Sequence, residues 1–400
     1  MRWFSTLSQN QNTENNLRES LDQIKSAWGN EPIDLLTLFV SPSFEKDYKK
    51  IQIFILEHLN PRVLIGCSAA GIIGGGNEIE TKPAISISVA RMSDVSLRAF
   101  RIEDEDLPDL DSSPKSWEKC VGVERSVEPH FLILADPFSI RIENLVSGLD
   151  YAYPHSVKVG GLASGAQAPG KNGLFLDQQL YRDGAVGIAF SGNIELDTLV
   201  AQGCRPIGKP FQITACEKNL LLGIDGKTPL EALEEIFNTL NPRDQDLIQH
   251  SLFLGIAATS TVKTNLGPGD FLIRNILAAD SKHGSLAIGN LLRIGQTVQF
   301  HLRDAQTSHE DLEEVLSKYS SRKGPFSEER VSSMGALLFS CVGRGSHLYK
   351  APNHDTNLFH KIIGHLPLAG FFCNGEIGPV AGTTYIHGYT SCFGLFSSKK

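Results

Sequence analysis

Continuous apolar runs and helical apolar stripes alternate along this chain in a fixed order. The run 34–40 predicts a buried strand, and the apolar residues between Phe44 and Leu59 recur at intervals of three and four, which predicts a helix. A second apolar run, 63–65, leads straight into a glycine-rich loop, and the strand 84–90 closes the segment. The pattern predicts a β-α-β-β unit with a loop after its second strand.

The same unit occurs three times in the sequence. The second copy spans 131–190 and the third spans 336–396. In each copy about 30 residues separate the first strand from the glycine loop, a period typical of repeated supersecondary units. We therefore expect the three loops to occupy equivalent places on related scaffolds; they are Gly66–Gly71, Gly160–Gly165 and Gly370–Gly375.

A different block separates the second copy from the third. Thr228 and Glu231 form a capping box at the start of a helix, with Pro229 at its first position. Apolar runs at 251–257, 270–274 and 298–303 predict strands. Together with the repeats, this block predicts an α+β fold with mixed β-sheets and helices.

Composition and charge restrict the class of protein. Among 400 residues, 41% are hydrophobic and 20% are charged, which describes a folded chain of two or three domains. The net charge of −8 argues against nucleic acid or an anionic membrane as a partner. No apolar run approaches the ~20 residues of a membrane-spanning helix, and no signal peptide is apparent. The seven cysteines include no C-x-x-C pair and fit a reducing compartment, so we expect a cytoplasmic protein.

The glycine loops are candidates for close approach to a ligand. Without a Cβ atom, backbone N–H groups can point into a cavity and hold a carboxylate or a phosphate. Ser68 and Ser164 lie beside two of the turns and add hydroxyl groups. The alternative is that the glycines only make tight turns between strands.

Charged and polar residues follow the strands of the third copy. If these strands lie side by side, Arg344, Asn374 and Glu376 emerge at the same end of one sheet, where ligand crevices are common. Arg344 could hold a carboxylate in a bidentate fork and Glu376 could accept from an amine, an arrangement suited to an amino acid. The alternatives are that Arg344 lies in solvent, pairs with an acid within the fold or pairs with Glu376, and that Asn374 and Gly375 form a plain tight turn.

Three cysteines, Cys67, Cys341 and Cys373, lie at strand ends next to these turns. A nucleophilic cysteine needs a nearby base, such as a histidine, or a helix N-terminus that lowers its pKa. The surrounding residues match no cysteine-hydrolase pattern, and a free cysteine also packs as a small apolar residue. Metal-ligand and nucleotide-binding motifs are absent from the sequence, so we expect neither a metal nor a cofactor.

Three of these segments resemble the FIST domains, which are named after F-box and intracellular signal transduction proteins. The segments 339–345 and 368–379 resemble the signature of the FIST C domain, and 63–73 resembles the matching loop of the FIST N domain. The resemblance implies two FIST domains behind a short lead. The expected divisions are an N-terminal helical lead at 1–33, a FIST N domain at 34–225 and a FIST C domain at 226–400.

The resemblance also implies a function, that of a sensory signal-transduction module. Its expected ligand is a small polar metabolite such as an amino acid, and its expected partner is a signalling protein. In the eukaryotic relatives an F-box precedes the pair and links it to a ubiquitin ligase, but the helical stripe at 17–28 is too short for an F-box. The expected ligand-binding residues are Gly66, Cys67, Ser68, Gly71, Gly160, Gly161, Ser164, Cys341, Arg344, Asn374, Gly375 and Glu376.

Two other functions stay open from the sequence. The first is a protein-docking scaffold without a small ligand, related to the substrate-recognition part of F-box ubiquitin ligase adaptors; an exposed apolar patch would favour it. The second is a cysteine or serine hydrolase, which requires a histidine within hydrogen-bond reach of Cys67, Cys341 or Ser68. A deep pocket where Arg344 and Glu376 converge would favour ligand sensing.

Overall fold

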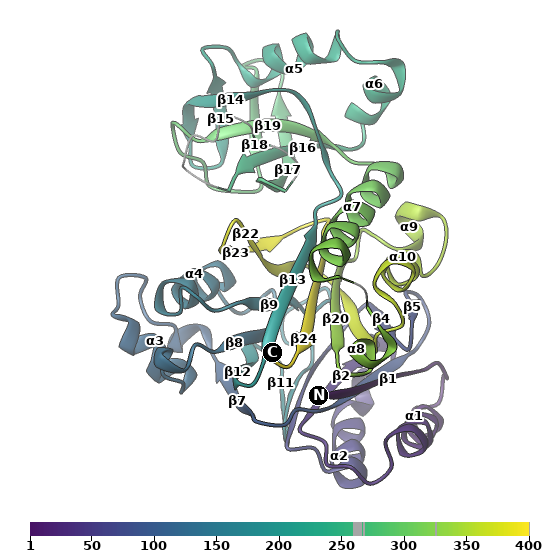
Figure 1. Cartoon of the computed structure of the whole chain (residues 1–400). Coiled ribbons are helices and arrows are strands. Elements are labelled where there is room, and N and C mark those ends of the chain that lie inside the picture. The colour runs from purple at the N-terminus through teal and green to yellow at the C-terminus, as the bar shows by residue number, and fades with distance from the viewer. Residues whose placement is uncertain (259–265, 267–268, 325, 400) are drawn as a thin grey trace. The chain divides into compact units, whose positions relative to one another are not determined.

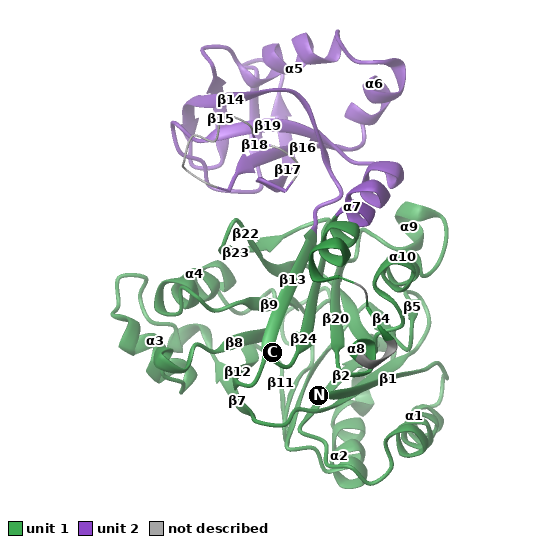
Figure 2. Ribbon diagram, in the orientation of Figure 1, with its two compact units in different colours: residues 1–200, 315–400 green, residues 201–314 purple. Residues whose placement is uncertain are grey.

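The computed structural model describes residues 1–258, 266, 269–324 and 326–399 (Figure 1). Helices and mixed sheets make up the chain, which confirms the predicted α+β fold. The chain divides into two compact units, residues 1–200 with 315–400 and residues 201–314 (Figure 2). Helix α7 (Ala305–Lys323) begins in the second unit and ends in the first.

The first unit contains three six-stranded sheets with the same strand order. Each has a parallel pair of strands at its centre, two further strands on one side and a short hairpin on the other. The first sheet is β1 (Arg2–Ser8), β6 (Ile85–Arg91), β2 (Leu35–Val40), β3 (Val63–Ser68), β10 (Leu174–Leu176) and β11 (Gln179–Tyr181). The second is β7 (Val95–Ile102), β12 (Ala185–Gly192), β8 (His130–Ala135), β9 (Lys158–Leu162), β22 (Glu376–Val380) and β23 (Thr383–His387). The third is β13 (Glu195–Ala201), β24 (Ser391–Ser397), β20 (Gly335–Cys341), β21 (Leu368–Cys373), β4 (Gly71–Gly74) and β5 (Asn77–Ile79).

The three repeats exchange their hairpins in a cycle. Hairpin β4–β5 follows the loop of the first repeat but pairs with β21 of the third. Hairpin β10–β11 follows the loop of the second repeat but pairs with β3 of the first, and β22–β23 of the third repeat pairs with β9 of the second. Each sheet is therefore built from two repeats. This cyclic order confirms the predicted repetition and the equivalence of the three loops.

A crossover helix joins the parallel strands of each repeat. These helices are α2 (Tyr48–Leu59), α4 (Ile142–Ala152) and α10 (His354–Ile363). Besides the end of α7, the other helices of this unit are α1 (Thr13–Trp28), α3 (Pro114–Val121), α8 (Glu328–Ser332) and α9 (Ser346–Tyr349), with 3-10 turns at Pro42–Asp47, Asp104–Asp106 and Arg125–Val127. Of the helices that the structure describes, none has both the length and the apolar character needed to cross a membrane.

Polar side chains tie the crossover helices to the exchanged hairpins. Gln52 of α2 donates from Nε2 to the carbonyl oxygens of Asp177 and Gln179, at 2.9 and 2.7 Å. Asp150 of α4 accepts from the backbone N–H and the hydroxyl of Thr384, at 2.6 and 2.7 Å. In each case a helix of one repeat holds the hairpin of another.

The central core of the first unit forms where the inner faces of the three sheets meet. Phe39 of β2 and Phe339 of β20 both pack against Phe371 of β21, with ring centroids 5.0 and 5.6 Å apart. Apolar residues of all three sheets join this cluster. Helices α1 and α2 cover the outer face of the first sheet, and α3 and α4 cover that of the second. The central strands are thus buried on both faces, which explains their unbroken apolar runs.

One glycine in each repeat allows the parallel strands to approach closely. The register pairs are Gly66 with Leu38, Gly160 with Ile133 and Gly370 with Leu338. A Cβ atom added to these glycines would lie only 1.8, 1.8 and 1.9 Å from the partner's carbonyl oxygen. The first glycine of each loop therefore serves strand packing.

The second unit is a closed antiparallel barrel of six strands with two helices of its own. In barrel order the strands are β14 (Arg205–Glu217), β15 (Leu220–Ile224), β18 (Ser285–Ile288), β17 (Phe271–Asp280), β16 (Leu252–Ala257) and β19 (Thr297–Leu302). Helix α5 (Pro229–Phe237) starts at the predicted capping box of Thr228 and Glu231, and α6 (Pro242–Ile248) follows. The predicted domain boundary at 225–226 falls between β15 and α5 and stays a prediction.

Several strands of the structure were not predicted. The predicted lead at 1–33 contains the expected helix α1 and, in addition, strand β1, which pairs with β6. The expected final strand at 387–396 is the end of β23, a turn and most of β24. The other unpredicted strands are β4, β5, β7, β10, β11, β13, β14, β15, β18 and β22.

Gly66→Ala tests the role of the first loop glycine. We expect it to lower the free energy of unfolding by at least about 2 kcal/mol, because the new Cβ collides with a backbone oxygen of the parallel ladder. Urea unfolding followed by circular dichroism measures this change. Gly388→Ala is the control, because a Cβ there meets no atom within 4 Å. Equal losses in the two variants would contradict the packing role.

Candidate functional site

The three glycine loops meet at one junction in the first unit. The N–H of Ala70 donates to Ser164 Oγ at 2.9 Å, and Ser164 Oγ donates to the carbonyl oxygen of Phe372. These residues belong to three different repeats, so a single hydroxyl joins all three loops. The N–H of Gly165 also donates to the carbonyl oxygen of Ser68 at 3.2 Å. The loops therefore converge, as the repetition in the sequence predicts.

Most of the expected ligand residues in the first loop lie inside the fold. Cys67 and Ser68 are fully buried. Ser68 Oγ accepts from the N–H of Gly173 at 2.9 Å and donates to Asn172 Oδ1 at 3.3 Å. A Cβ on Gly71 would lie 2.5 Å from the ring of Phe372. These residues hold the junction together from within.

The exposed part of the junction is small. Ala70 and Asn374 are exposed, and Gly165 is half-buried. The N–H of Asn374 donates to the carbonyl oxygen of Leu162 at 3.1 Å. The N–H of Leu162 donates in turn to the carbonyl oxygen of Gly375 at 2.9 Å. The third loop is thus bound to the second, with the side chain of Asn374 at the surface. Gly161 is buried, and a Cβ on it would lie 3.1 Å from Cys373 Sγ.

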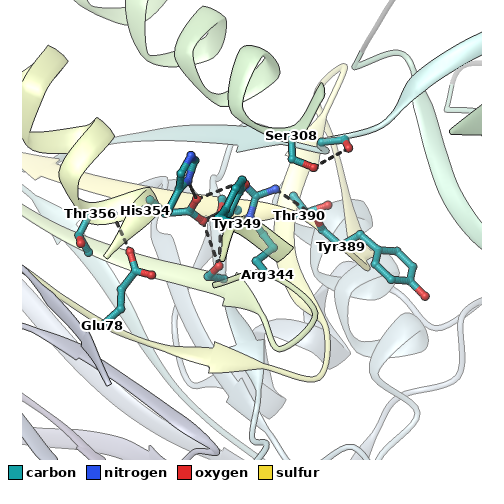
Figure 3. Close-up of polar contacts among 12 residues, drawn as sticks. Glu78, Ser308, Arg344, Tyr349, His354, Thr356, Tyr389 and Thr390 are labelled. Carbon is teal, nitrogen blue, oxygen red and sulfur yellow. Dashed lines mark hydrogen bonds and ion pairs between the residues drawn. The ribbon is translucent and has the colours of Figure 1, made fainter. Parts of the chain in front are cut away.

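Arg344 is fully buried and paired with an acid (Figure 3). Its Nε and Nη2 donate to the two carboxylate oxygens of Asp355 at 2.9 and 3.1 Å, a bidentate geometry. Nη2 also donates to the Tyr349 hydroxyl at 2.5 Å, and Nη1 donates to the carbonyl oxygen of Tyr389 at 3.3 Å. Of the alternatives open from the sequence, pairing with an acid within the fold is the one observed.

Asp355, in the first turn of α10, is the centre of this buried network. Besides Arg344 it accepts from the hydroxyls of Ser340, at 3.2 Å, and Ser391. His354 Nδ1 lies 2.9 Å from its Oδ1, and the His354 ring stacks on Tyr349. Burial by itself would raise the pKa of Asp355, but the Arg344 guanidinium and these hydrogen bonds outweigh burial and hold the pKa well below its usual range.

A second buried carboxyl, Glu78, reaches the same place from the exchanged hairpin β4–β5. Its Oε1 accepts from the N–H of Thr356 in α10 at 2.7 Å, and its own N–H donates to Asn353 Oδ1 at 2.7 Å. Burial raises the pKa of Glu78 to about 8, and the negative charge of Asp355 adds to the shift. Glu78 is therefore protonated at neutral pH. It ties the hairpin of the first repeat to the helix of the third.

Cys373 in the third loop and Glu376 directly after it are both buried. Glu376 Oε2 accepts from the N–H of Thr390 at 3.1 Å, and its Oε1 lies 3.5 Å from Cys373 Sγ. Burial raises the pKa of Cys373, and the Glu376 carboxylate adds to the shift; burial alone raises that of Cys67. A nucleophilic cysteine needs the opposite shift. Cys341 is also buried and is the register partner of Cys373.

Four hollows in the first unit lie away from the junction. They are lined by the ends of α1 and α2, by the segment 30–34 with 59–62, by β7 with 122–127, and by the ends of α7 and β24. None of these four is lined by a loop glycine, Arg344 or Glu376. Among the residues that the structure describes, no group of three or more histidine, cysteine or acidic side chains could hold a metal ion.

Two protein-family models match most of the sequence of this chain. The FIST N domain matches residues 34–227 and the FIST C domain matches 229–379. The chain belongs to the FIST family. FIST domains are signal-transduction domains, so the chain is assigned to signal transduction at the level of the family.

Relatives of this FIST protein include bacterial and eukaryotic chains. An uncharacterized protein of Mycobacterium tuberculosis is 34% identical over 339 residues, which cover 84% of each chain. An uncharacterized protein of Mycobacterium bovis is 31% identical over 94% of each chain. An F-box/LRR-repeat protein of Arabidopsis thaliana is 22% identical over 62% of this chain and 52% of its own. The crystal structure of a cyanuric acid hydrolase from A. caulinodans aligns with this structure over 100% of both chains, with 6% sequence identity and a TM-score of 0.37.

Four residues of the buried network around Arg344 were not predicted from the sequence. Glu78, Tyr349, His354 and Asp355 carry no motif, and Glu78 stands 278 positions from Thr356, its partner. The available signal was indirect: the strand pair of each repeat lacks a neighbour on one side, and the short run Ile72–Ile73 after the first loop could supply one. Whether the twelve expected residues contact a ligand stays a prediction.

Glu78→Gln tests the raised pKa of this carboxyl. Because the folded-state pKa of about 8 lies above the ordinary value of 4.5, the stabilisation from a protonated Glu78 is complete below about pH 4.5 and is lost as the pH rises to 8. Glutamine cannot ionise, so the stability of the variant relative to wild type should rise between pH 5 and 8, by about 3–4 kcal/mol. Urea unfolding at several pH values measures it. Parallel curves for wild type and variant would refute the assignment, and exposed Glu57→Gln should leave the curve unchanged.

Arg344→Met tests the buried ion pair. Removing the arginine leaves Asp355 charged and without its main partner, so we expect a loss of about 3–5 kcal/mol in the free energy of unfolding. Adding Asp355→Asn to this variant should recover part of the loss, because the uncompensated charge disappears. Chemical unfolding of the two variants and of Arg18→Met, which breaks an exposed pair with Glu14, gives the comparison. A double variant no more stable than the single one would contradict the account.

Proposed function

We propose that this FIST protein is a sensory module that binds a small polar metabolite of the size of an amino acid at the junction of the three glycine loops. The observation that supports this proposal is the convergence of the loops, which Ser164 joins through one hydroxyl. A ligand at the junction would contact three repeats at once. It would therefore act on the exchanged strands that hold the unit together.

The exposed edge of the junction supplies the recognition chemistry. Asn374 carries an amide that both donates and accepts, which suits the ammonium and carboxylate groups of an amino acid. Arg344 and Glu376, expected from the sequence to contact the ligand, instead hold the third loop in place through Asp355 and Thr390. In this proposal Arg344 and Glu376 position the third loop, and the exposed edge of that loop binds the metabolite.

The output of the sensor is a change in the binding of a signalling protein. We place both proteins in the cytoplasm, since the seven cysteines form no disulfide, which fits a reducing compartment. Occupancy of the junction would be transmitted because a ligand that binds one arrangement of the loops more tightly shifts the population toward it.

A thermal-shift screen against amino acids and central metabolites tests the sensor proposal. A ligand that binds the native state must raise the melting temperature, and we expect at least one polar metabolite to raise it by about 2 °C or more at millimolar concentration. Asn374→Ala should abolish that shift. The matched control is Asn357→Ala, an exposed asparagine on α10 that lies outside the junction. A screen without any shift, or a shift that Asn374→Ala leaves intact, would overturn the proposal.

A protein-docking role is the second candidate, and exposed apolar side chains on the barrel favour it. Five large aliphatic side chains of the second unit are 39–71% exposed: Leu220, Leu222, Leu277, Leu291 and Ile294. Where exposed apolar side chains form a contiguous patch, they mark a protein-binding surface. Replacing Leu291 and Ile294 by serine should abolish binding to a purified partner, whereas Leu110→Ser in the first unit should not. Undiminished binding by the double variant would exclude this surface.

A further inference from the structure

A crevice of about 620 Å³ lies in the first unit. Its lining residues come from the end of α7, helix α8 and the ends of β13 and β24, which are labelled in Figure 2. Its volume is within the range of small-molecule sites. No residue of the glycine loops lines it. The residues that matter for its chemistry are Glu195, Lys323, Arg330, Ser397, Ser398 and Lys399.

The charge of this crevice is opposite to that of the chain. Three cationic side chains and one carboxylate line it, in a protein with a net charge of −8. Lys323 is neutralised within the fold, because its Nζ lies 2.8 Å from Glu195 Oε1 and 2.7 Å from Asp197 Oδ2. The charges of Arg330 and Lys399 are therefore the ones available to a ligand.

Arg330 is held in place without an acidic partner. Its Nη1 donates to the carbonyl oxygen of Lys323 at 2.7 Å, and its guanidinium lies 4.5 Å from the ring centroid of Phe326. Within the described part of the chain, no acceptor contacts its Nε or Nη2 and no carboxylate pairs with it. A fixed guanidinium with two free donor groups is suited to bind a carboxylate or a phosphate group.

The opposite wall adds hydroxyl donors. Ser397 and Ser398 follow one another at the end of β24, directly before Lys399. A serine hydroxyl can donate to an anionic oxygen, and the lysine ammonium adds a second cation. Buried Met334 gives the crevice an apolar side that can contact the carbon skeleton of a metabolite.

We propose that this crevice binds a small metabolite through an oxyanion, a phosphate or a carboxylate group, that Arg330 and Lys399 hold together with the two serine hydroxyls. The site is separate from the loop junction and does not depend on the sensor proposal. It adds a second ligand to the FIST fold, bound where α7 ends and the third repeat begins.

The probes that test this site are inorganic phosphate and succinate, each compared with sodium chloride at equal ionic strength. We expect at least one of the two to raise the melting temperature of the full chain by about 2–4 °C at ten times its dissociation constant. Titration calorimetry should then show binding at least tenfold weaker in Arg330→Ala and in Lys399→Ala. Lys399 is exposed, so its replacement leaves the fold intact.

Two control variants separate this site from its surroundings. Arg322→Ala removes an exposed arginine of α7 that does not line the crevice, and it should keep full affinity. Asn374→Ala, which alters the loop junction, should also keep it. A response to phosphate alone assigns a phosphate ligand, and a response to succinate alone assigns a carboxylate. Equal responses in sodium chloride, no response to either probe, or full affinity in both Arg330→Ala and Lys399→Ala would overturn the proposal.

Discussion

The first unit depends on the hydrogen bonds between each exchanged hairpin and the parallel strand pair of a neighbouring repeat. A parallel pair has an open edge, and an open edge is a site for wrong pairing. The exchange closes that edge in all three sheets, so the repeats stabilise one another in a ring. It also explains the place of the junction, because each loop is the segment that carries the chain from its own sheet into the next.

The polar side chains that hold the hairpins to the helices differ in the free energy that their burial costs. Gln52 and Asp150 hold their hairpins with one amide and one partly exposed carboxylate. At the third helix the tie is Glu78, a carboxyl buried beside the Asp355–Arg344 pair. Burying three ionisable groups together is costly unless charge and hydrogen bonds balance, and here one carboxyl stays protonated while the other pairs with the arginine. A buried carboxyl with a strongly shifted pKa often marks a functional region. In this protein it lies where two repeats exchange strands.

The sequence was informative wherever the signal was local or repeated. The runs 34–40 and 63–65 predicted a strand pair that is parallel in the structure, and the equivalence of the three loops followed from their spacing. The exchanged hairpins could not be predicted, because a strand such as Gly71–Gly74 has four residues and pairs with a repeat almost 300 positions away. Arg344 was correctly placed at a strand end. Its partner Asp355 lies on a helix that the sequence located, but which acid would face it depends on three-dimensional packing.

Native-state hydrogen exchange of an Ile72→Ala variant, measured by mass spectrometry, tests most directly whether the exchange of hairpins makes the first unit one cooperative body. Ile72 is buried in hairpin β4–β5 and is the register partner of Phe371. The account predicts that strands β2, β8 and β20, one from each repeat, lose protection by the same factor, because the ring opens as a whole. Loss of protection confined to β20 and β21, with β2 and β8 unchanged, would contradict it.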